Sequence, residues 1–102
     1  MKQSLINKHA IVCGSTDGIG KASALLLAKQ GCEITLVARN QDKLDKTQSE
    51  LNTNHNQKHY SVCADFDNSM DLKNKIKMHI NSLGRSIDIL VNNSGGPHGL
   101  SL

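Results

Sequence analysis

The sequence predicts an α/β fold, a doubly wound parallel sheet of four strands and three helices. Short apolar runs alternate with amphipathic or charged stretches along the 102 residues, and the links between them are short. Such alternation favours parallel strands joined by right-handed crossovers, with helices on both faces of the sheet. In a doubly wound sheet of this kind the strands lie in the order 3-2-1-4.

The first strand and helix are predicted from an apolar run, a glycine-rich turn and an alanine- and leucine-rich stretch. Residues 10–13 form the predicted strand, and residues 18–30 form the helix that follows it. Gly31 stands just past this helix, in the place where a glycine commonly ends one. Apolar residues at a spacing of three to four predict which face of the helix is buried: Ile19, Ala22, Leu25 and Leu26.

The second strand is predicted at residues 33–37, which are rich in β-branched side chains. Asn40 is a suitable N-cap for a helix over residues 41–52. This helix has a charged surface and few apolar anchors, chiefly Leu44 and Leu51, so we expect an outer helix that is only partly covered.

The second half of the chain repeats the alternation. Residues 59–64 predict the third strand, residues 70–83 the third helix and residues 87–91 the fourth strand. Gly84 ends the third helix, and the polar, glycine-containing residues 92–97 end the fourth strand. Apolar residues at helical spacing form the stripe that the third helix buries: Leu72, Ile76, Ile80 and Leu83.

The turn after the first strand predicts a phosphate site. Gly14, Gly18 and Gly20 allow a tight turn and let a ligand approach the backbone, while the helix that follows presents unpaired N–H groups. The spacing is G-x-x-x-G-x-G, which fits neither the dinucleotide fingerprint G-x-G-x-x-G nor the P-loop pattern. A turn with a helix cap and no ligand is the alternative for the glycines alone.

Composition excludes several classes of function. A net charge of +3 without a basic cluster does not suggest nucleic-acid binding. No apolar run approaches the ~18 residues of a membrane span, and the start lacks the apolar core of a signal peptide. Three cysteines without metal spacing predict reduced, mostly buried thiols in a cytoplasmic protein. The five histidines are scattered, so we expect surface residues and no metal site.

The predicted topology brings two turns to one crevice. Ligands of doubly wound sheets bind beyond the carboxyl ends of the strands, at the switch point, which here falls between the first and fourth strands. Gly14 follows the first strand and Asn92 follows the fourth. Two such turns flanking one crevice indicate a ligand site more strongly than either turn alone.

Three motifs resemble those of the short-chain dehydrogenase/reductase family. Residues 14–20, Gly-Ser-Thr-Asp-Gly-Ile-Gly, are similar to its cofactor loop, and residues 88–95 to its Asn-Asn-Ala-Gly segment, with Ser94 in place of alanine. Asp65 matches the family's adenine-contacting aspartate, with a helix-preceding cap as the alternative. Cys13 replaces the usual threonine, whose hydroxyl helps tie the loop together. The resemblance covers nearly the whole chain and implies a Rossmann-type fold that binds NAD(P).

The end of the second strand favours NADP(H) over NAD(H). An acidic residue there would bind a ribose 2′-hydroxyl, whereas Arg39 offers forked donors to a 2′-phosphate. A solvated loop cation is the alternative, and Asp17 stands where the family's NADP enzymes often carry a base. The resemblance implies these cofactor-binding residues: Gly14, Ser15, Thr16, Asp17, Gly18, Ile19, Gly20, Arg39, Asn40, Asp65, Phe66, Asn92, Ser94 and Gly95.

The family's catalytic residues have no counterpart in the sequence. Hydride transfer in this family uses a tyrosine with a lysine four positions on, and a serine, but the single tyrosine is Tyr60, followed at that spacing by Ala64. Residues 1–102 therefore resemble the N-terminal cofactor-binding portion of a reductase, without catalytic residues and inactive alone. A half-domain that pairs with another chain and a remnant without function are the alternatives. The unpaired edge of the fourth strand predicts self-association.

Overall fold

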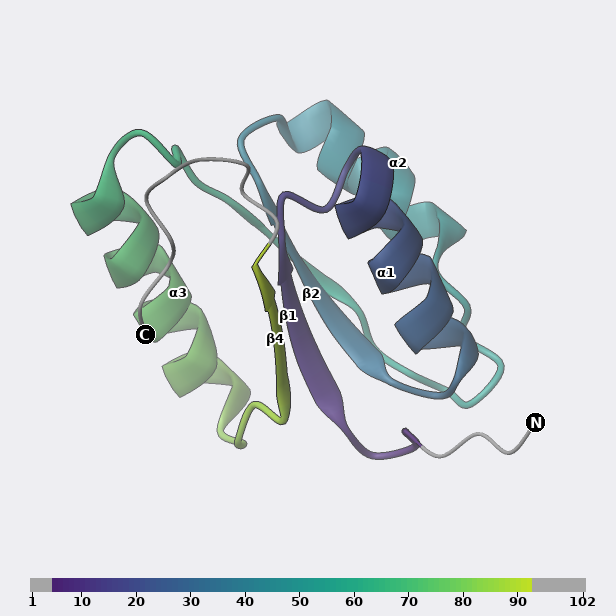
Figure 1. The fold of residues 1–102 in the computed structure, drawn as a ribbon. Coiled ribbons are helices and arrows are strands. Elements are labelled where there is room, and N and C mark those ends of the chain that lie inside the picture. Colours follow the sequence, from purple (N-terminus) through teal and green to yellow (C-terminus); the bar gives the residue numbers. More distant parts are fainter. Residues whose placement is uncertain (1–4, 93–102) are drawn as a thin grey trace.

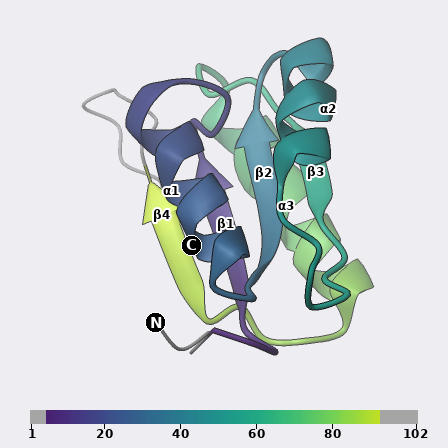
Figure 2. The ribbon, with the colours of Figure 1, turned by 90° about the vertical axis from the view of Figure 1, so that its right-hand side faces the viewer.

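The computed structural model describes residues 5–92 and shows a four-stranded parallel sheet in the order β3-β2-β1-β4. Helices α1 and α2 cover one face of the sheet and α3 covers the other (Figures 1 and 2). The predicted fold class, strand order and number of helices are confirmed. The elements are β1 (His9–Cys13), α1 (Gly18–Lys29), β2 (Glu33–Ala38), α2 (Gln41–Glu50), β3 (Tyr60–Cys63), α3 (Ser69–Leu83) and β4 (Ile89–Asn92).

Strand β1 is the centre of the molecule, because it pairs with β2 on one side and β4 on the other. All of its residues are buried, as expected for a strand covered on both faces. Its side chains alternate between two cores: Ala10 and Val12 face α1 and α2, and Ile11 and Cys13 face α3. The pairing of Cys13 with Asn92 sets the ends of β1 and β4 side by side.

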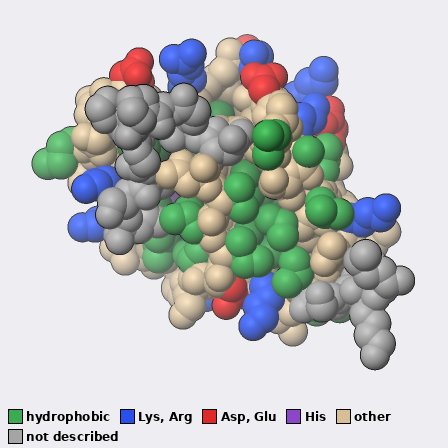
Figure 3. Space-filling view, viewed as in Figure 1, with side chains coloured by type: hydrophobic (Ala, Val, Ile, Leu, Met, Phe, Trp, Pro, Cys, Tyr) green, Lys and Arg blue, Asp and Glu red, His purple; other side chains and the backbone are tan. Residues whose placement is uncertain are grey.

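Helix α1 buries a different face from the one predicted. Gly20, Ala24 and Ala28, spaced by four residues, are buried, whereas Ile19 is 73% exposed and Leu26 is 56% exposed. Small side chains on one stripe let the helix lie close to the sheet. Since apolar residues occur nearly all round this helix, spacing alone did not identify that stripe. Hydrophobic side chains are gathered over the part of the surface where α1 and β4 lie (Figure 3).

The helix ends predicted at Gly31, Asn40 and Gly84 are confirmed, whereas α2 ends at Glu50, two residues earlier than predicted. Gly31 after α1 and Gly84 after α3 adopt φ values of +98° and +66°, which glycine tolerates best. The side chain of Asn40 caps α2 by accepting a hydrogen bond from the backbone N–H of Lys43 at 3.0 Å. The two predicted anchors are buried, Leu44 within α2 at 0% and the C-cap residue Leu51 at 4% exposure, and most other residues of α2 are exposed, as expected for a partly covered outer helix.

The expectation that the histidines lie at the surface is wrong for His9 and His59, which are buried. At the amino ends of the strands, Nε2 of His9 and Nε2 of His79 both lie 2.7 Å from the Thr35 hydroxyl, which links β1, β2 and α3. His59 accepts a hydrogen bond from the backbone N–H of Ile34 at 3.0 Å. These residues lie far apart in the sequence, so no local pattern pointed to their hydrogen bonds.

Both imidazoles of the Thr35 network have lowered pKa values. Burial lowers the pKa of His9, and the nearby Arg85 charge lowers it further, although the carboxylates of Glu33 and Asp88 act in the opposite direction. Burial also lowers the pKa of His79, with a smaller effect from His9. The folded chain therefore binds fewer protons at these sites than the unfolded chain does.

We predict that this network makes the fold sensitive to mild acid. Its contribution is fully present above the unfolded histidine pKa of about 6.5 and is lost as the pH falls from there through the lowered folded values. Urea unfolding measured from about pH 7.5 to about pH 5 tests this prediction. His79→Gln should flatten the pH dependence, whereas His55→Gln, outside the network, should leave it unchanged; equal curves for the two variants would contradict the assignment.

Candidate functional site

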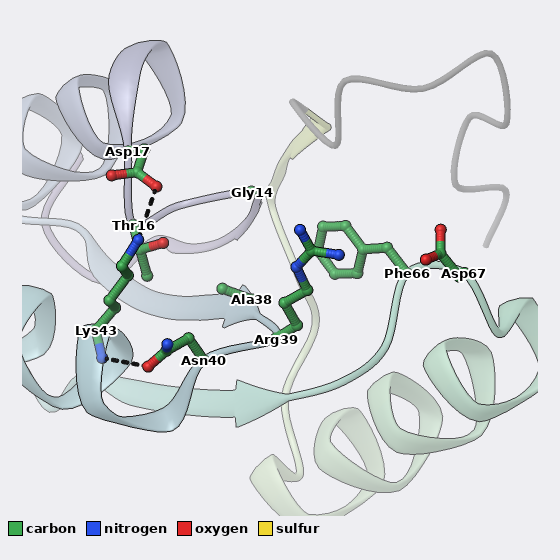
Figure 4. A pocket seen from close by; sticks show the side chains of 9 residues that line it. All are labelled: Gly14, Thr16, Asp17, Ala38, Arg39, Asn40, Lys43, Phe66 and Asp67. Carbon is green, nitrogen blue, oxygen red and sulfur yellow. Dashed lines mark hydrogen bonds and ion pairs between the residues drawn. The ribbon is translucent and has the colours of Figure 1, made fainter.

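An open pocket of about 680 Å³ lies at the carboxyl ends of β1, β2 and β3 (Figure 4). This volume is within the range of about 300–1,000 Å³ that is typical of small-molecule sites. Three segments that follow three different strands form its walls, together with the first turn of α2. The lining residues are Gly14, Thr16, Asp17, Ala38, Arg39, Asn40, Lys43, Phe66 and Asp67.

The first wall is the loop between β1 and α1. Gly14 has a left-handed φ of +72°, and its N–H donates to the carbonyl oxygen of Val37 at 2.9 Å. The buried hydroxyl of Ser15 donates to the same carbonyl at 3.4 Å. These two bonds tie the loop to the end of β2. Cys13 has no hydroxyl that could tie the loop together, as the family's usual threonine does at this position. Ser15 therefore supports the pocket from behind rather than lining it.

The loop leaves the amino end of α1 open to a ligand. Asp17 is the N-cap residue of α1, yet its side chain makes no capping hydrogen bond to the helix. The carboxylate points instead toward the Lys43 ammonium group, at a distance of 3.6 Å (Figure 4). The first N–H groups of a helix and its positive dipole end attract anions, so this wall suits a phosphate.

The second wall follows β2 and contributes both cations of the pocket. Arg39 and Asn40 are exposed at the end of the strand, and Lys43 lies one turn further on, in α2. In Figure 4 the Arg39 side chain extends toward the side of the pocket where Phe66 lies, and Lys43 extends toward Asp17. The two cations therefore border the pocket on different sides.

The third wall follows β3 and combines an aromatic ring with a carboxylate, those of Phe66 and Asp67. Asp65 does not line the main pocket; it lines a neighbouring hollow of about 480 Å³, together with Arg39 and Asp67 among others. Its carboxylate accepts a hydrogen bond from the Asp67 N–H at 2.9 Å, which shapes the turn into α3. The N-cap of that helix is Asn68, whose side chain accepts from the helix backbone.

The structure separates the predicted site residues into four groups. Gly14, Thr16, Asp17, Arg39, Asn40 and Phe66 line the pocket. A second group does not line the pocket: it consists of the first turn of α1, Gly18, Ile19 and Gly20, and of Asn92 at the end of β4. Ser15 and Asp65 lie directly behind or beside the pocket, as described above. Ser94 and Gly95 lie outside the described residues.

The prediction missed Ala38, Lys43 and Asp67, which also line the pocket. Lys43 had a usable signal, because an N-cap at Asn40 sets the third helical residue beside the turn that follows β2. The pocket also lies over β1, β2 and β3, rather than over the predicted crevice between the first and fourth strands. The fourth-strand side of that crevice depends on residues after Asn92, outside the described part of the chain.

The sequence matches the family model of the short chain dehydrogenases over residues 8–101. The chain belongs to the short-chain dehydrogenase family. The resemblance predicted from the glycine loop and the Asn-Asn-Ser-Gly segment is thereby confirmed, and with it an oxidoreductase family that uses a nicotinamide cofactor.

Relatives of this short-chain dehydrogenase chain are much longer proteins. It is 42% identical over 90 residues to the very-long-chain 3-oxoacyl-CoA reductase of Bos taurus, covering 88% of this chain and 28% of that protein. A second such reductase, from Danio rerio, is 40% identical and is matched over 93% of this chain and 30% of its own length. The chain thus spans less than a third of these relatives.

A solved short-chain dehydrogenase structure shows the same fold with its ligands. L-sorbose reductase of Gluconobacter frateurii, complexed with NADPH and L-sorbose, superposes with a TM-score of 0.80 at 33% identity. The match covers 94% of this chain and 36% of that protein. Among the described residues of the present chain, no helix combines the length and apolar character needed to cross a bilayer.

We predict that two left-handed glycines of the chain differ in function. Gly14→Ala and Gly84→Ala each place a side chain at positive φ and should lower the free energy of unfolding by about 1 kcal/mol. Gly14 lines the pocket, whereas Gly84 ends α3, so only Gly14→Ala should also weaken dinucleotide binding measured by calorimetry. Equal losses of binding in the two variants would show that Gly14→Ala acts through stability alone.

Proposed function

We propose that this chain is the cofactor-binding part of an NADP(H)-linked oxidoreductase that transfers hydride between nicotinamide and a carbonyl or alcohol. The observation that carries the proposal is the pocket beyond β1, β2 and β3, in which Arg39 follows β2 where a carboxylate would select NAD(H). Its domain is then the N-terminal part of a Rossmann domain, over residues 1–102.

The proposed placement of the cofactor follows the walls of the pocket. The glycine loop and the uncapped amino end of α1 would hold the pyrophosphate, with Gly14 allowing its close approach. Arg39 would bind the ribose 2′-phosphate with its forked donors, and Phe66 and Asp65 would lie near the adenine. The NADPH bound by L-sorbose reductase, a relative in structure and sequence, supports this choice of cofactor.

When bound, the nicotinamide accepts or supplies the hydride, while the residues of this chain bind and orient the dinucleotide. We propose that they do not themselves complete the reaction. Tyr60 begins β3 at the amino end of the sheet and contacts the rings of His9 and His79, with centroids at 6.0 and 5.3 Å. It therefore lies at the opposite end of the sheet from the pocket, and the residue four positions on is Ala64.

The substrate class of the complete protein is proposed from its relatives. The names of two of them describe reduction of very-long-chain 3-oxoacyl-CoA, a carbonyl compound, and a carbonyl substrate is consistent with hydride transfer from NADPH.

We also propose a reducing compartment such as the cytoplasm. Burial raises the pKa of the Cys13 and Cys32 thiols to about 11, which keeps both thiols protonated and unreactive.

A second candidate function is a nucleotide-binding module that pairs with another copy of the chain. Strand β4 is the end strand of the described sheet, and Leu90 within it is 41% exposed. Hydrophobic side chains gather over this part of the surface (Figure 3). An exposed edge strand with apolar side chains is a template for pairing between chains.

Calorimetry with NADPH and NADH tests the proposed cofactor. Arg39→Ala should weaken NADPH binding about tenfold or more, the effect of losing one hydrogen-bonded charge, and should affect NADH far less. Equal losses for the two cofactors would remove the basis for NADP(H), and binding of neither by the unmodified chain would contradict a dinucleotide site. Reduction of a carbonyl compound by the isolated chain with NADPH would contradict its proposed inactivity.

Sedimentation velocity over a range of concentrations tests the pairing through β4. We expect a dimer of the unmodified chain that dissociates on dilution, and a monomer for Leu90→Lys, because a lysine on an edge strand opposes pairing. Met78→Lys, at an exposed residue of α3 outside the edge strand, is the matched control and should leave the dimer intact. A monomer at every concentration would exclude the pairing.

A further inference from the structure

The charge that faces the glycine loop across the pocket comes from Lys43. Its ammonium group lies 3.6 Å from the carboxylate of Asp17, and both side chains line the pocket (Figure 4). Asp17 introduces a negative charge into a loop that is built to receive phosphate. Lys43 neutralises that charge from the opposite wall.

The pair is readily exchanged for another partner. The Lys43 side chain is 57% exposed and that of Asp17 is 79% exposed, and exposed ion pairs contribute little to stability. Neither side chain has a second task in the described structure: Asp17 makes no capping bond, and α2 is capped by Asn40 through the Lys43 backbone N–H. A more highly charged anion in the pocket can therefore replace Asp17 as the partner of the Lys43 ammonium group with little loss of folding stability.

We propose that Lys43 is a second binding residue for the 2′-phosphate and, with Arg39, determines the preference for NADP(H). The inference rests on the proposed function. A phosphate monoester carries a charge of about −1.5 to −2 and three acceptor oxygens, so it attracts an ammonium group more strongly than one carboxylate does. Asp17 then acts as the resting partner of Lys43, holding its ammonium group over the pocket until a phosphate arrives.

The two cations line the same pocket from different sides. Arg39 precedes the cap at Asn40 and Lys43 follows it in α2, so a phosphate bound between their side chains can contact both (Figure 4). The amino end of α2 adds its positive dipole end beside them. Asp17 and Asp67 are the carboxylates that line the pocket, and they oppose a bound anion. A single cation would leave that opposition largely uncompensated.

Calorimetry with 2′,5′-ADP and 5′-AMP tests the inference, because the two nucleotides differ only in the 2′-phosphate. For the unmodified chain we expect tighter binding of 2′,5′-ADP. Lys43→Gln should weaken 2′,5′-ADP about tenfold and leave 5′-AMP nearly unchanged. Asp17→Asn should tighten 2′,5′-ADP several-fold, because it removes the competing charge, and asparagine is an equally good residue at the N-cap.

Lys46→Gln is the matched control, since Lys46 is an exposed lysine of the same helix that does not line the pocket. Circular dichroism and thermal unfolding of each variant establish that the fold is retained. If Lys43→Gln loses no more affinity for 2′,5′-ADP than Lys46→Gln does, the role of Lys43 is overturned. The NADP(H) proposal would still stand in that case. Equal affinity of the unmodified chain for the two nucleotides would overturn the NADP(H) proposal and, with it, the inference.

Discussion

The candidate site depends on the hydrogen bond from the N–H of Gly14 to the carbonyl oxygen of Val37. This bond joins the end of β1 to the end of β2 at the point where the chain must leave the sheet. The left-handed φ of Gly14 then turns the loop away, and the Ser15 hydroxyl bonds to the same carbonyl. Because β1 is buried between two strands and two helical layers, the loop is held on a rigid support.

The two ends of the sheet have opposite characters. At the carboxyl ends, polar and charged side chains are exposed and border an open pocket. At the amino ends, the Thr35 hydroxyl contacts two imidazoles, and Arg85 bonds to Glu33 at 3.0 Å close by. This end holds β1, β2 and α3 together through polar contacts, of which the one between His9 and Thr35 is fully buried. The side chains at the carboxyl ends of the same strands are therefore not needed to hold these elements together, and they can border a ligand pocket instead.

Local signals predicted the fold almost completely, and tertiary contacts decided the rest. The strand order follows from the alternation of strands and helices along the chain, and the cap at Asn40 and the helix-ending glycines follow from residue type at single positions. The buried face of α1 does not, because its apolar residues surround the helix and only the sheet selects the stripe of Gly20, Ala24 and Ala28. Buried His9 escaped prediction for the same reason, because its partner Thr35 is distant in the sequence. Lys43 is different, since the cap at Asn40 is a local signal that places it beside the turn after β2.

The charges of the pocket explain why composition alone says little about its ligand. Among the lining residues, the two cations Arg39 and Lys43 are balanced by the two carboxylates Asp17 and Asp67. Net charge therefore does not draw an anion to this site. In the proposed site, selectivity would come from an exchange of partners, in which a phosphate replaces the Asp17 carboxylate beside Lys43. Because the Asp17 side chain is 79% exposed, its carboxylate can turn to water, and the exchange would cost the fold little.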